Sequence, residues 1–435
     1  MNKFLMLKKI INFLSYISLF LFVIFFLLLI LINLNIFNLK NNFYSLFPNV
    51  ELRKNIFNKK SIMENFRNDY NVKFLPFTEF EKLSFKKIRI KFNSDYYANK
   101  LKFKDSASYK KYGTFFIDIY HDDLLIADYL GNFYFLDKIY NKISSDNDFV
   151  IKSINSDLKI ERAFDIFVHN KKIFISYTLN NNNCNTVNIS YAEINLKILN
   201  FKNFFNSEEC SESGAAGKIH FIQLNNSKGF LFSTAEGTPD NPGVNSQNIN
   251  SIYGKILFIP LDNPKDFKIF SSGHRVIQGL NIYDNKIIAT EHGPRGGDEI
   301  NRIIQNKNYG WPVVSLGERY DFQYDNNSIT YKKNHKLNNF EEPIFAFIPS
   351  IGISEIIKLP KSFSIFYDSH YVLASLNGRS IYFLRFDEQI SKILSLEKIF
   401  IGQRVRDLKY YEKTRSLFLA LEDEGEIGIL TKKKY

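Results

Sequence analysis

One pattern returns six times along this chain and constrains its fold more than any other feature. A short run of β-branched and aromatic residues ends in small residues, and a Gly, Asn or Asp turn follows. The runs begin at Leu124, Ile173, Phe230, Ile287, Tyr371 and Leu417, at intervals of 49, 57, 57, 84 and 46 residues. Short strands with turns and no long amphipathic helix between them indicate an all-β array.

The spacing of the runs narrows the fold class further. A propeller blade takes about 40–50 residues, so six runs predict a six-bladed β-propeller. The interval of 84 residues then carries an insertion. Coincidental recurrence in a β-sandwich is the alternative that the pattern leaves open. We assign residues 76–435 to the propeller and residues 41–75, rich in Asn and mixed charge, to a stalk.

Residues 1–40 have a different character. No charged side chain occurs from Ile10 to Leu39, and Leu19–Ile32 is apolar throughout. About 20 apolar residues cross the hydrocarbon core as a helix, so we predict one uncleaved transmembrane anchor. Three lysines at the N-terminus, Lys3, Lys8 and Lys9, favour a periplasmic, extracytoplasmic body, whereas Lys40 and later basic residues favour the opposite orientation.

The net charge of +12 does not indicate nucleic-acid binding, because it lies at the two ends of the chain. Residues 1–60 carry +7 and Lys432–Lys434 carry three more positive charges, which leaves +2 for the body. A nucleic-acid binder concentrates positive charge on its folded face. The two cysteines, Cys184 and Cys210, allow one disulfide in an oxidising compartment and are too few for a four-thiolate zinc site.

The densest run of unusual residues is EHGPRGGDEIN, from Glu291 to Asn301, followed by NYGWP from Asn308 to Pro312. Three glycines around one proline predict a tightly bent backbone in which carbonyl groups converge. Carbonyl and carboxylate oxygens are the ligands that Ca²⁺ selects. The segment is therefore either a cation-binding loop or a structured loop without a cation.

These motifs resemble the soluble quinoprotein glucose dehydrogenase and aldose sugar dehydrogenase family, also called glucose/sorbosone dehydrogenases. Further matches are SIYGKILFIPLD from Ser251, SGHRVIQGL from Ser272, EPIFAFIPSIGISEI from Glu342 and GQRVRDL from Gly402. The resemblance covers roughly residues 110–435 and implies a six-bladed propeller. It also implies oxidation of a sugar at its anomeric carbon, with pyrroloquinoline quinone and calcium as cofactors.

The resemblance assigns roles to six residues. Gly293 and Pro294 fall where the family presents two main-chain carbonyls to the calcium of the cofactor, and Glu299 and Tyr309 resemble positions that hold a second, structural calcium. Arg404 and Arg406 match the arginine pair that contacts the quinone. Their alternation places both on one face of a strand, as a grip on an anion requires. An ion pair with Asp407 or a neighbouring blade is the alternative for these arginines.

Other family positions are altered, and no catalytic base is assigned. The family histidine falls at Gly214, its quinone-contacting lysine at Asn377, and its Arg-Asn pair at Pro239-Asp240. A family glutamine has no equivalent around Glu161-Arg162-Ala163. His292 is the best replacement base, although a loop histidine more often orders its own backbone. His220 lies near Gly214 but is expected on the wrong side of its strand, and His335 is expected at the surface.

Two functions therefore remain in competition. The first is a membrane-anchored, quinone-dependent sugar dehydrogenase with a sugar substrate. The second is a non-catalytic propeller braced by calcium that binds a carbohydrate or a protein partner, because propellers serve both purposes. A sugar-lactone hydrolase is a distant third, since its acidic metal cluster is not visible in the sequence.

Overall fold

The computed structural model describes residues 73–74, 83–91, 113–142, 149–181, 184–211, 217–224, 227–237, 244–318, 331–364 and 366–432. The predicted anchor, residues 1–40, lies outside this set, and the predicted stalk is described only at Lys73–Phe74. Over the described part of the chain, no helix has both the length and the apolar character needed to cross a membrane.

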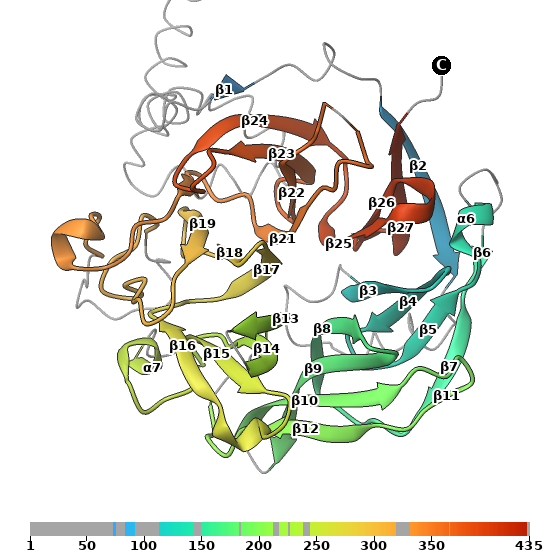
Figure 1. Cartoon of the computed structure of the whole chain (residues 1–435), viewed down its shortest axis with the longest axis horizontal. Helices are drawn as coiled ribbons and strands as arrows, with labels where there is room; N and C mark the ends of the chain where they lie inside the picture. The colour runs from blue at the N-terminus through green and yellow to red at the C-terminus, as the bar shows by residue number, and fades with distance from the viewer. Residues whose placement is uncertain are drawn as a thin grey trace, which may run out of the picture. The chain divides into compact units, whose positions relative to one another are not determined.

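The described strands form six sheets around a common centre (Figure 1). Each sheet is named here from its innermost strand outward. Sheet 1 holds β3 (Phe115–Tyr120), β4 (Asp123–Asp128), β5 (Phe133–Leu136), β7 (Lys152–Ser156) and β11 (Ile198–Leu199). Sheet 2 holds β8 (Arg162–His169), β9 (Lys172–Asn181), β10 (Cys184–Glu193) and β12 (Lys202–Asn206). Sheet 3 holds β13 (Ile219–Leu224), β14 (Ser227–Ser233), β15 (Lys255–Pro260) and β16 (Lys268–Ser272).

The second half of the ring repeats this arrangement. Sheet 4 holds β17 (Ile277–Tyr283), β18 (Lys286–Glu291), β19 (Asp298–Ile303) and β20 (Phe345–Phe347). Sheet 5 holds β21 (Ile353–Lys358), β22 (His370–Ser375), β23 (Ser380–Phe386), β24 (Ile393–Phe400) and β1 (Lys73–Phe74). Sheet 6 holds β25 (Val405–Tyr411), β26 (Ser416–Leu421), β27 (Glu426–Lys432), β2 (Leu83–Lys91) and β6 (Phe149–Val150). The described helices are short: α6 (Ile139–Lys142), α7 (Val244–Gln247), η2 (Pro264–Asp266), η3 (Lys336–Asn338) and η4 (Glu412–Thr414).

The prediction of a six-bladed β-propeller is confirmed. Each of the six recurrent runs falls on the second strand of a different sheet, namely β4, β9, β14, β18, β22 and β26. The 84-residue interval contains the long connection between β19 and β20, which runs from residue 304 to residue 344. The apolar run recurs in every sheet because each second strand is buried against both neighbouring strands and both neighbouring sheets.

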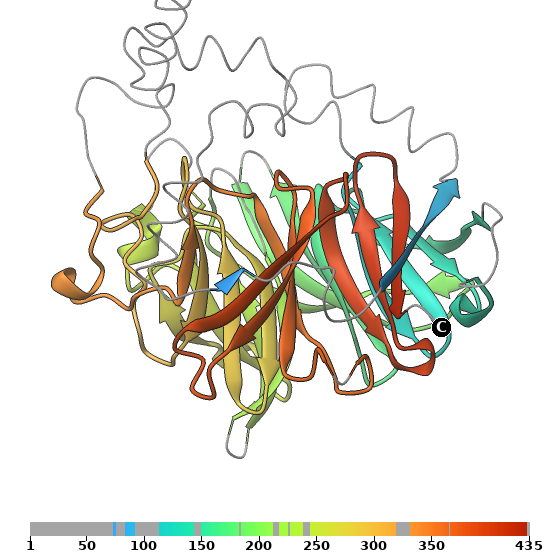
Figure 2. The same cartoon turned by 90° about the horizontal axis from the view of Figure 1, so that it is seen from above.

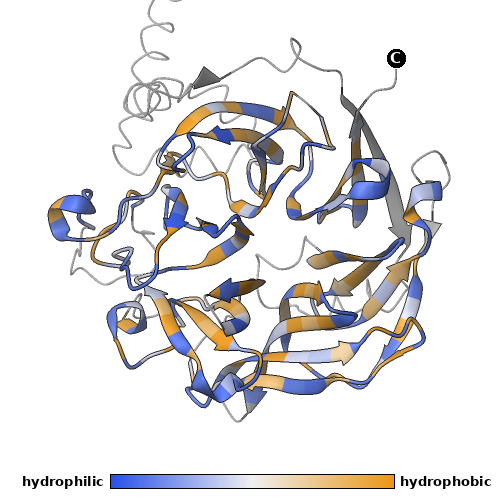
Figure 3. Cartoon of the chain, viewed as in Figure 1, coloured by the Kyte–Doolittle hydropathy of each residue, from blue (hydrophilic) through white to orange (hydrophobic). Residues whose placement is uncertain are grey.

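Apolar side chains between adjacent sheets form the core. One cluster joins sheet 6 to sheet 1 and includes Ile126 and Phe418, both fully buried. A second joins sheets 2 and 3 and includes Val187 and Phe230. Figure 3 shows apolar residues along the strands of the sheets. Because burial of one such side chain contributes roughly 1.5–3 kcal/mol, these contacts hold the blades together in the ring.

The ring closes with a strand from the other end of the sequence. β2 pairs antiparallel with β27, with Leu83 opposite Lys432 and Arg89 opposite Glu426. Figures 1 and 2 show β2 beside the C-terminal strands of sheet 6. Strand hydrogen bonds therefore link the N-terminal and C-terminal parts of the propeller.

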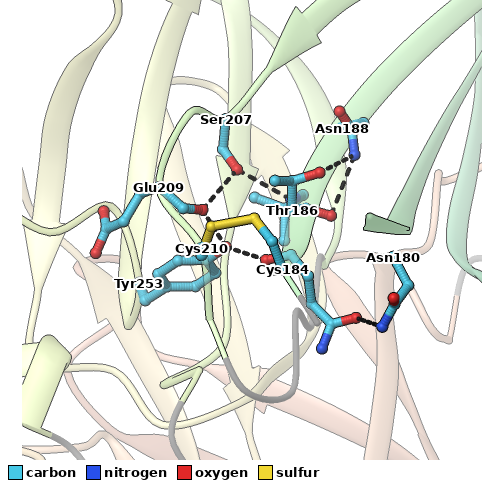
Figure 4. Close-up of a disulfide and its surroundings, with 10 residues drawn as sticks. Asn180, Cys184, Thr186, Asn188, Ser207, Glu209, Cys210 and Tyr253 are labelled. Atoms are coloured by element: carbon cyan, nitrogen blue, oxygen red, sulfur yellow. Dashed lines mark hydrogen bonds between the residues drawn. A yellow bond between two sulfur atoms is a disulfide. The ribbon is translucent and has the colours of Figure 1, made fainter. Parts of the chain in front are cut away.

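A disulfide between Cys184 and Cys210 joins β10 to the segment that precedes β13 (Figure 4). Next to it, the carboxylate of Glu209 accepts hydrogen bonds from the Ser251 hydroxyl at 2.5 Å and from the Ile252 N–H at 2.8 Å. The Tyr253 hydroxyl donates to the Glu209 carbonyl at 2.9 Å. The disulfide therefore fixes a segment that holds sheet 3 through its loop at 251–253.

Candidate functional site

A cavity of about 390 Å³ opens at the centre of the ring. Every blade contributes to its wall, because the residues that line it lie at or near the ends of the inner strands and their connections. The described residues that line it are Thr114, Phe116, Tyr129, Arg162, Ala163, Phe164, Gly217, Lys218, Val276, Ile277, Gln278, His292, Leu376, Arg404, Arg406 and Glu422. Four of these side chains are cationic and one, Glu422, is a carboxylate.

Arg404 and Arg406 lie together in this wall, and both contact Glu422. The Nε atom of Arg404 lies 2.9 Å from one carboxylate oxygen of Glu422, and the Nε atom of Arg406 lies 2.5 Å from the other. The Glu422 side chain is fully buried, whereas those of the arginines are 19% and 16% exposed. The carboxylate that both arginines contact is thus Glu422, which directly follows β26, whereas the sequence had suggested Asp407.

The electrostatics of this trio favour its charged form. Burial opposes ionisation of Glu422, but Arg406 and Arg404 outweigh it and lower the pKa of this carboxyl. Arg406 also donates from Nη1 to Oε1 of Gln278, at 2.9 Å. Two guanidinium groups share one carboxylate, so the trio keeps one net positive charge beside the cavity. Such an arrangement can bind a carboxylate through forked hydrogen bonds.

Four inner strands change register, and three of the shifts fall at residues that line this cavity. The shifts lie between Ala163 and Asp165 in β8, Ile277 and Gly279 in β17, Ile353 and Ile356 in β21, and Val405 and Asp407 in β25. A β-bulge re-aims the side chain at the extra position. Phe164, Gln278 and Arg406 occupy three of these positions and line the cavity. The bulges therefore turn inner-strand residues toward the pocket.

A buried ion cluster adjoins the cavity through Lys218. The Lys218 ammonium lies 2.7 Å from Asp165 and 2.5 Å from Glu355, which belong to sheets 2 and 5. Lys409 lies 3.7 Å from Asp118. Burial opposes the charge of Lys218, but Asp165 and Glu355 outweigh it and raise the pKa of this ammonium. The ion pairs connect blades across the channel and leave Lys218 at the cavity wall.

The four residues predicted to hold calcium meet around one smaller cavity. Gly293, Pro294, Glu299 and Tyr309 all line a space of about 10 Å³, together with Glu291 and His292. That volume suits one water molecule or one ion. Among the described residues, no group of three or more His, Cys, Asp or Glu side chains is arranged to hold a metal ion. Any cation here would depend on carbonyl oxygens and on the carboxylates of Glu291 and Glu299.

The backbone around this small cavity is tightly bent. Gly296 and Gly297 have φ values of +90° and +71°, which L side chains rarely adopt. A Cβ atom on Gly293 would lie 2.2 Å from the Gly297 carbonyl oxygen. The Gly293 carbonyl accepts a hydrogen bond from Nη1 of Arg275 at 3.1 Å. The bent loop of the sequence analysis is therefore present, and Arg275 holds one of its carbonyls.

Glu299 lies in an acidic and poorly hydrated place. Burial, reinforced by the facing Glu291, raises the pKa of Glu299 to about 8. The Oδ1 atom of Asn301 beside it is buried without a hydrogen-bond partner. His335, expected at the surface, is buried 3.8 Å from Glu299, and burial lowers its pKa to about 4. The expected surface position of His335 was wrong, because the segment that contains it packs against Glu299 of β19.

His292 faces both cavities. Its Nε2 atom lies 2.6 Å from the Ile353 carbonyl oxygen, which can only accept, so Nε2 carries the proton. Burial lowers the pKa of His292, which keeps the ring neutral and leaves Nδ1 as the proton-accepting atom. His220, in contrast, is absent from the cavity wall and packs near Phe167.

The structure describes some of the altered family positions and not others. Gly214 and Pro239-Asp240 lie outside the described residues. Asn377 is exposed, and its neighbour Leu376 lines the cavity instead. Sequence reasoning missed Lys218, Gln278 and Glu422 as wall residues and did not recognise Arg162 as one. For Glu422 a signal existed, since it is an acidic residue directly after β26, the strand that follows β25.

Comparisons with known proteins agree with this geometry. The family model described as Glucose / Sorbosone dehydrogenase matches residues 156–430, well over half of the chain. The aldose sugar dehydrogenase of Escherichia coli is 26% identical over 291 residues, 60% of this chain and 73% of that protein. The quinoprotein glucose dehydrogenase B of Acinetobacter calcoaceticus is 37% identical over 119 residues, a quarter of each chain.

Two further comparisons bear on coverage and fold. An uncharacterized protein of Synechocystis sp. is 35% identical over 197 residues, 42% of this chain and 46% of that protein. The chain thus spans less than half the length of two of these three relatives. The crystal structure of the Escherichia coli aldose sugar dehydrogenase in its apo form superposes with a TM-score of 0.61 at 16% identity, covering 81% of this chain and all of that one. By its family match, the chain belongs to the glucose/sorbosone dehydrogenase family.

Proposed function

We propose that this protein is a quinone-dependent aldose dehydrogenase that binds pyrroloquinoline quinone in the central cavity. The observation that carries the proposal is the Arg404–Arg406–Glu422 trio, which presents two guanidinium groups to a cavity of about 390 Å³. The cofactor carries several carboxylates. A relative of this chain from Acinetobacter calcoaceticus is named a quinoprotein glucose dehydrogenase. The cationic wall therefore fits the charge of the cofactor.

The described residues have separate tasks in such a reaction. When bound, the quinone supplies the two-electron acceptor for oxidation of the sugar at its anomeric carbon. Arg404 and Arg406 would hold the cofactor carboxylates without reorganisation, because Glu422 already fixes both Nε atoms. Nδ1 of His292 would accept the proton of the sugar hydroxyl. Lys218, at the wall of this space, is held by Asp165 and Glu355.

Calcium is part of the proposal at the small cavity. Its donors are oxygens, as calcium requires, and they include the carboxylate of Glu299 and the carbonyls of Gly293 and Pro294. The partnerless Asn301 Oδ1 is a further oxygen near Glu299. Burial and, after it, repulsion by Glu291 raise the pKa of Glu299, and a bound cation would relieve that repulsion.

The proposal extends to location. The Cys184–Cys210 disulfide supports an oxidising, extracytoplasmic compartment. Anchoring by one helix within residues 1–40 rests on the apolar run in the sequence.

The second candidate function is a non-catalytic propeller. The observation in its favour is Asn377, which replaces the quinone-contacting lysine of the family and lies exposed outside the cavity wall. Calorimetry of the purified protein with pyrroloquinoline quinone and calcium, followed by an aldose screen with a dye acceptor, separates the two. The enzyme predicts quinone binding and turnover of at least one aldose. If wild type binds no quinone with calcium present, the enzyme proposal fails and the binding propeller replaces it.

A further inference from the structure

A permanent cation lies in the wall of the small cavity. Arg275, between β16 and β17, lines this space together with the residues predicted to hold calcium. Its Nη1 atom donates to the main-chain carbonyl of His292 at 3.2 Å and to that of Gly293 at 3.1 Å. A guanidinium is not deprotonated in proteins. The Gly293 carbonyl, one of the oxygens proposed above for calcium, therefore already faces a fixed positive charge.

Neighbouring side chains hold Arg275 in this place. Its Cζ atom lies 5.3 Å from the centre of the Trp311 ring, within the range of a cation–π contact. The Nε1 atom of Trp311 donates to Glu236 at 2.7 Å, and Glu236 lies 3.6 Å from Nε of Arg275. That Nε atom is buried and has no hydrogen-bond partner among the described residues. Glu236 thus offsets the charge of Arg275 through an ion pair that is too long for a hydrogen bond.

The charge of Arg275 bears directly on calcium binding. A carbonyl oxygen has two lone pairs, so the hydrogen bond from Arg275 does not by itself exclude a metal ion. A calcium ion at about 2.3–2.6 Å from the Gly293 carbonyl oxygen would, however, lie within about 6 Å of Nη1. Two cations at such a distance repel each other strongly where little water separates them. Arg275 therefore opposes calcium at this loop, whereas Glu291 and Glu299 favour it.

We propose that Arg275 makes calcium binding at this loop depend on the anionic quinone. Without the quinone, the guanidinium at the Gly293 carbonyl lowers the affinity for calcium. The negative charge of a bound quinone compensates both cations, so each of the two ligands raises the affinity for the other. The inference rests on the proposed function. It goes beyond that function by assigning the coupling between the two ligands to one side chain.

The test is calorimetry on the full-length protein and three variants. Arg275→Gln removes the charge, Arg275→Lys keeps it, and Arg385→Gln removes an exposed arginine from β23 as the control. Melting curves first confirm that each variant folds. Each protein is stripped of metal with a chelator and titrated with calcium chloride alone. The titration is then repeated after loading with pyrroloquinoline quinone and removal of unbound quinone.

We expect the variants to separate by charge. Without quinone, Arg275→Gln should bind calcium roughly 5- to 150-fold more tightly than wild type, the usual range of coupling between two sites. Arg275→Lys and Arg385→Gln should stay near wild type. Bound quinone should raise the calcium affinity of wild type within the same range, and this gain should be smaller in Arg275→Gln.

The inference is overturned if folded Arg275→Gln binds calcium no more tightly than wild type, or if neither protein binds calcium. If Arg275→Gln does not fold, the other titrations decide. Equal calcium affinity of wild type with and without quinone then overturns the inference, and a matching gain in wild type and Arg275→Lys supports it. Failure of the proposed function gives a different result. If wild type binds no quinone, the enzyme proposal falls, and the titration of Arg275→Gln with calcium alone still tests Arg275.

Discussion

At the scale of single residues, the shared contact with Glu422 decides how Arg404 and Arg406 respond to substitution. Arg404→Ala and Arg406→Ala should each weaken quinone binding by about 1.5–3 kcal/mol, the range for hydrogen bonds to charged groups. One arginine remains in each variant to compensate the buried Glu422, so the fold should persist. Calorimetry and melting curves check both statements, with Arg385→Gln as the charge-matched control. Unchanged affinity in both variants would contradict the assignment.

Part of this site was predictable from the sequence, and part was not. Alternation along Gln-Arg-Val-Arg-Asp predicts Arg404 and Arg406 on one face of a strand, whereas Arg404 directly precedes β25 and a bulge at Arg406 interrupts the alternation, and both side chains still contact Glu422. Their partner was missed because Glu422 belongs to the next strand, and only the pairing of β25 with β26 brings it near. Lys218 and Arg162 were missed because a single cation at a strand end has no local signature.

At the scale of elements, we predict that a chelator changes the melting temperature. The segments concerned are the bent loop between β18 and β19 and the residues after β19. A ligand bound only by the folded state stabilises it by mass action, so a chelator should lower the melting temperature. Glu299→Ala should remove most of this sensitivity, because it deletes one of the two carboxylates at the small cavity. The exposed Glu424 provides the matched control, Glu424→Ala, which should keep it. A melting curve that a chelator does not shift would exclude calcium at this loop.

The disulfide gives a second prediction at this scale. Cys184 and Cys210 are separated by 26 residues, and loss of such a cross-link costs about 2–4 kcal/mol through the unfolded chain. We expect the double variant Cys184→Ser/Cys210→Ser to lose that much unfolding free energy in urea. Reduction of wild type should reproduce the loss and leave the variant unaffected. If reduction changes neither protein, the bridge does not form in solution.

Element positions were predictable where hydrophobic periodicity is strong. The six runs located the second strand of every blade, because the centre of that strand is buried and carries several apolar residues in succession. The bulges on β8, β17, β21 and β25 were not predictable. A bulge depends on the register with the partner strand, which periodicity within one strand does not contain.

At the scale of the whole molecule, the buried cluster in the channel predicts a pH dependence of stability. Burial, together with Asp407 and Asp165, outweighs Lys218 and raises the pKa of Glu355 to about 7 from an ordinary value near 4.5. The folded state thus holds this proton more tightly, so the contribution to stability is complete below about pH 4.5 and declines as pH rises to about 7. Glu355→Gln should therefore resemble wild type near pH 5 and lose less stability than wild type between pH 5 and 7.5. Urea titrations at both values measure this, and equal losses in the two proteins would refute it.

Truncation tests how the ring is completed. Removal of residues 1–40 should leave a folded, soluble body, because every described strand begins after that segment. Removal of residues 1–112 also deletes β2 and exposes the edge of β27, so this variant should melt at a lower temperature and aggregate. Circular dichroism and light scattering compare the two. Equal stability of the two truncations would mean that β2 does not contribute to closure.

Closure by β2 also has a consequence for synthesis on the ribosome. β2 leaves the ribosome early, and its partner β27 lies roughly 340 residues later, which at about 5–20 residues per second means a wait of roughly 20 to 70 s. During that time the edge of β2 that pairs with β27 has no final partner. The sequence of β2, LSFKKIRIK, carries four basic residues, and charges of one sign discourage pairing with the wrong strand. β2 is the first strand of the sixth blade to be made. That blade is therefore complete only when β27, its last strand, has emerged.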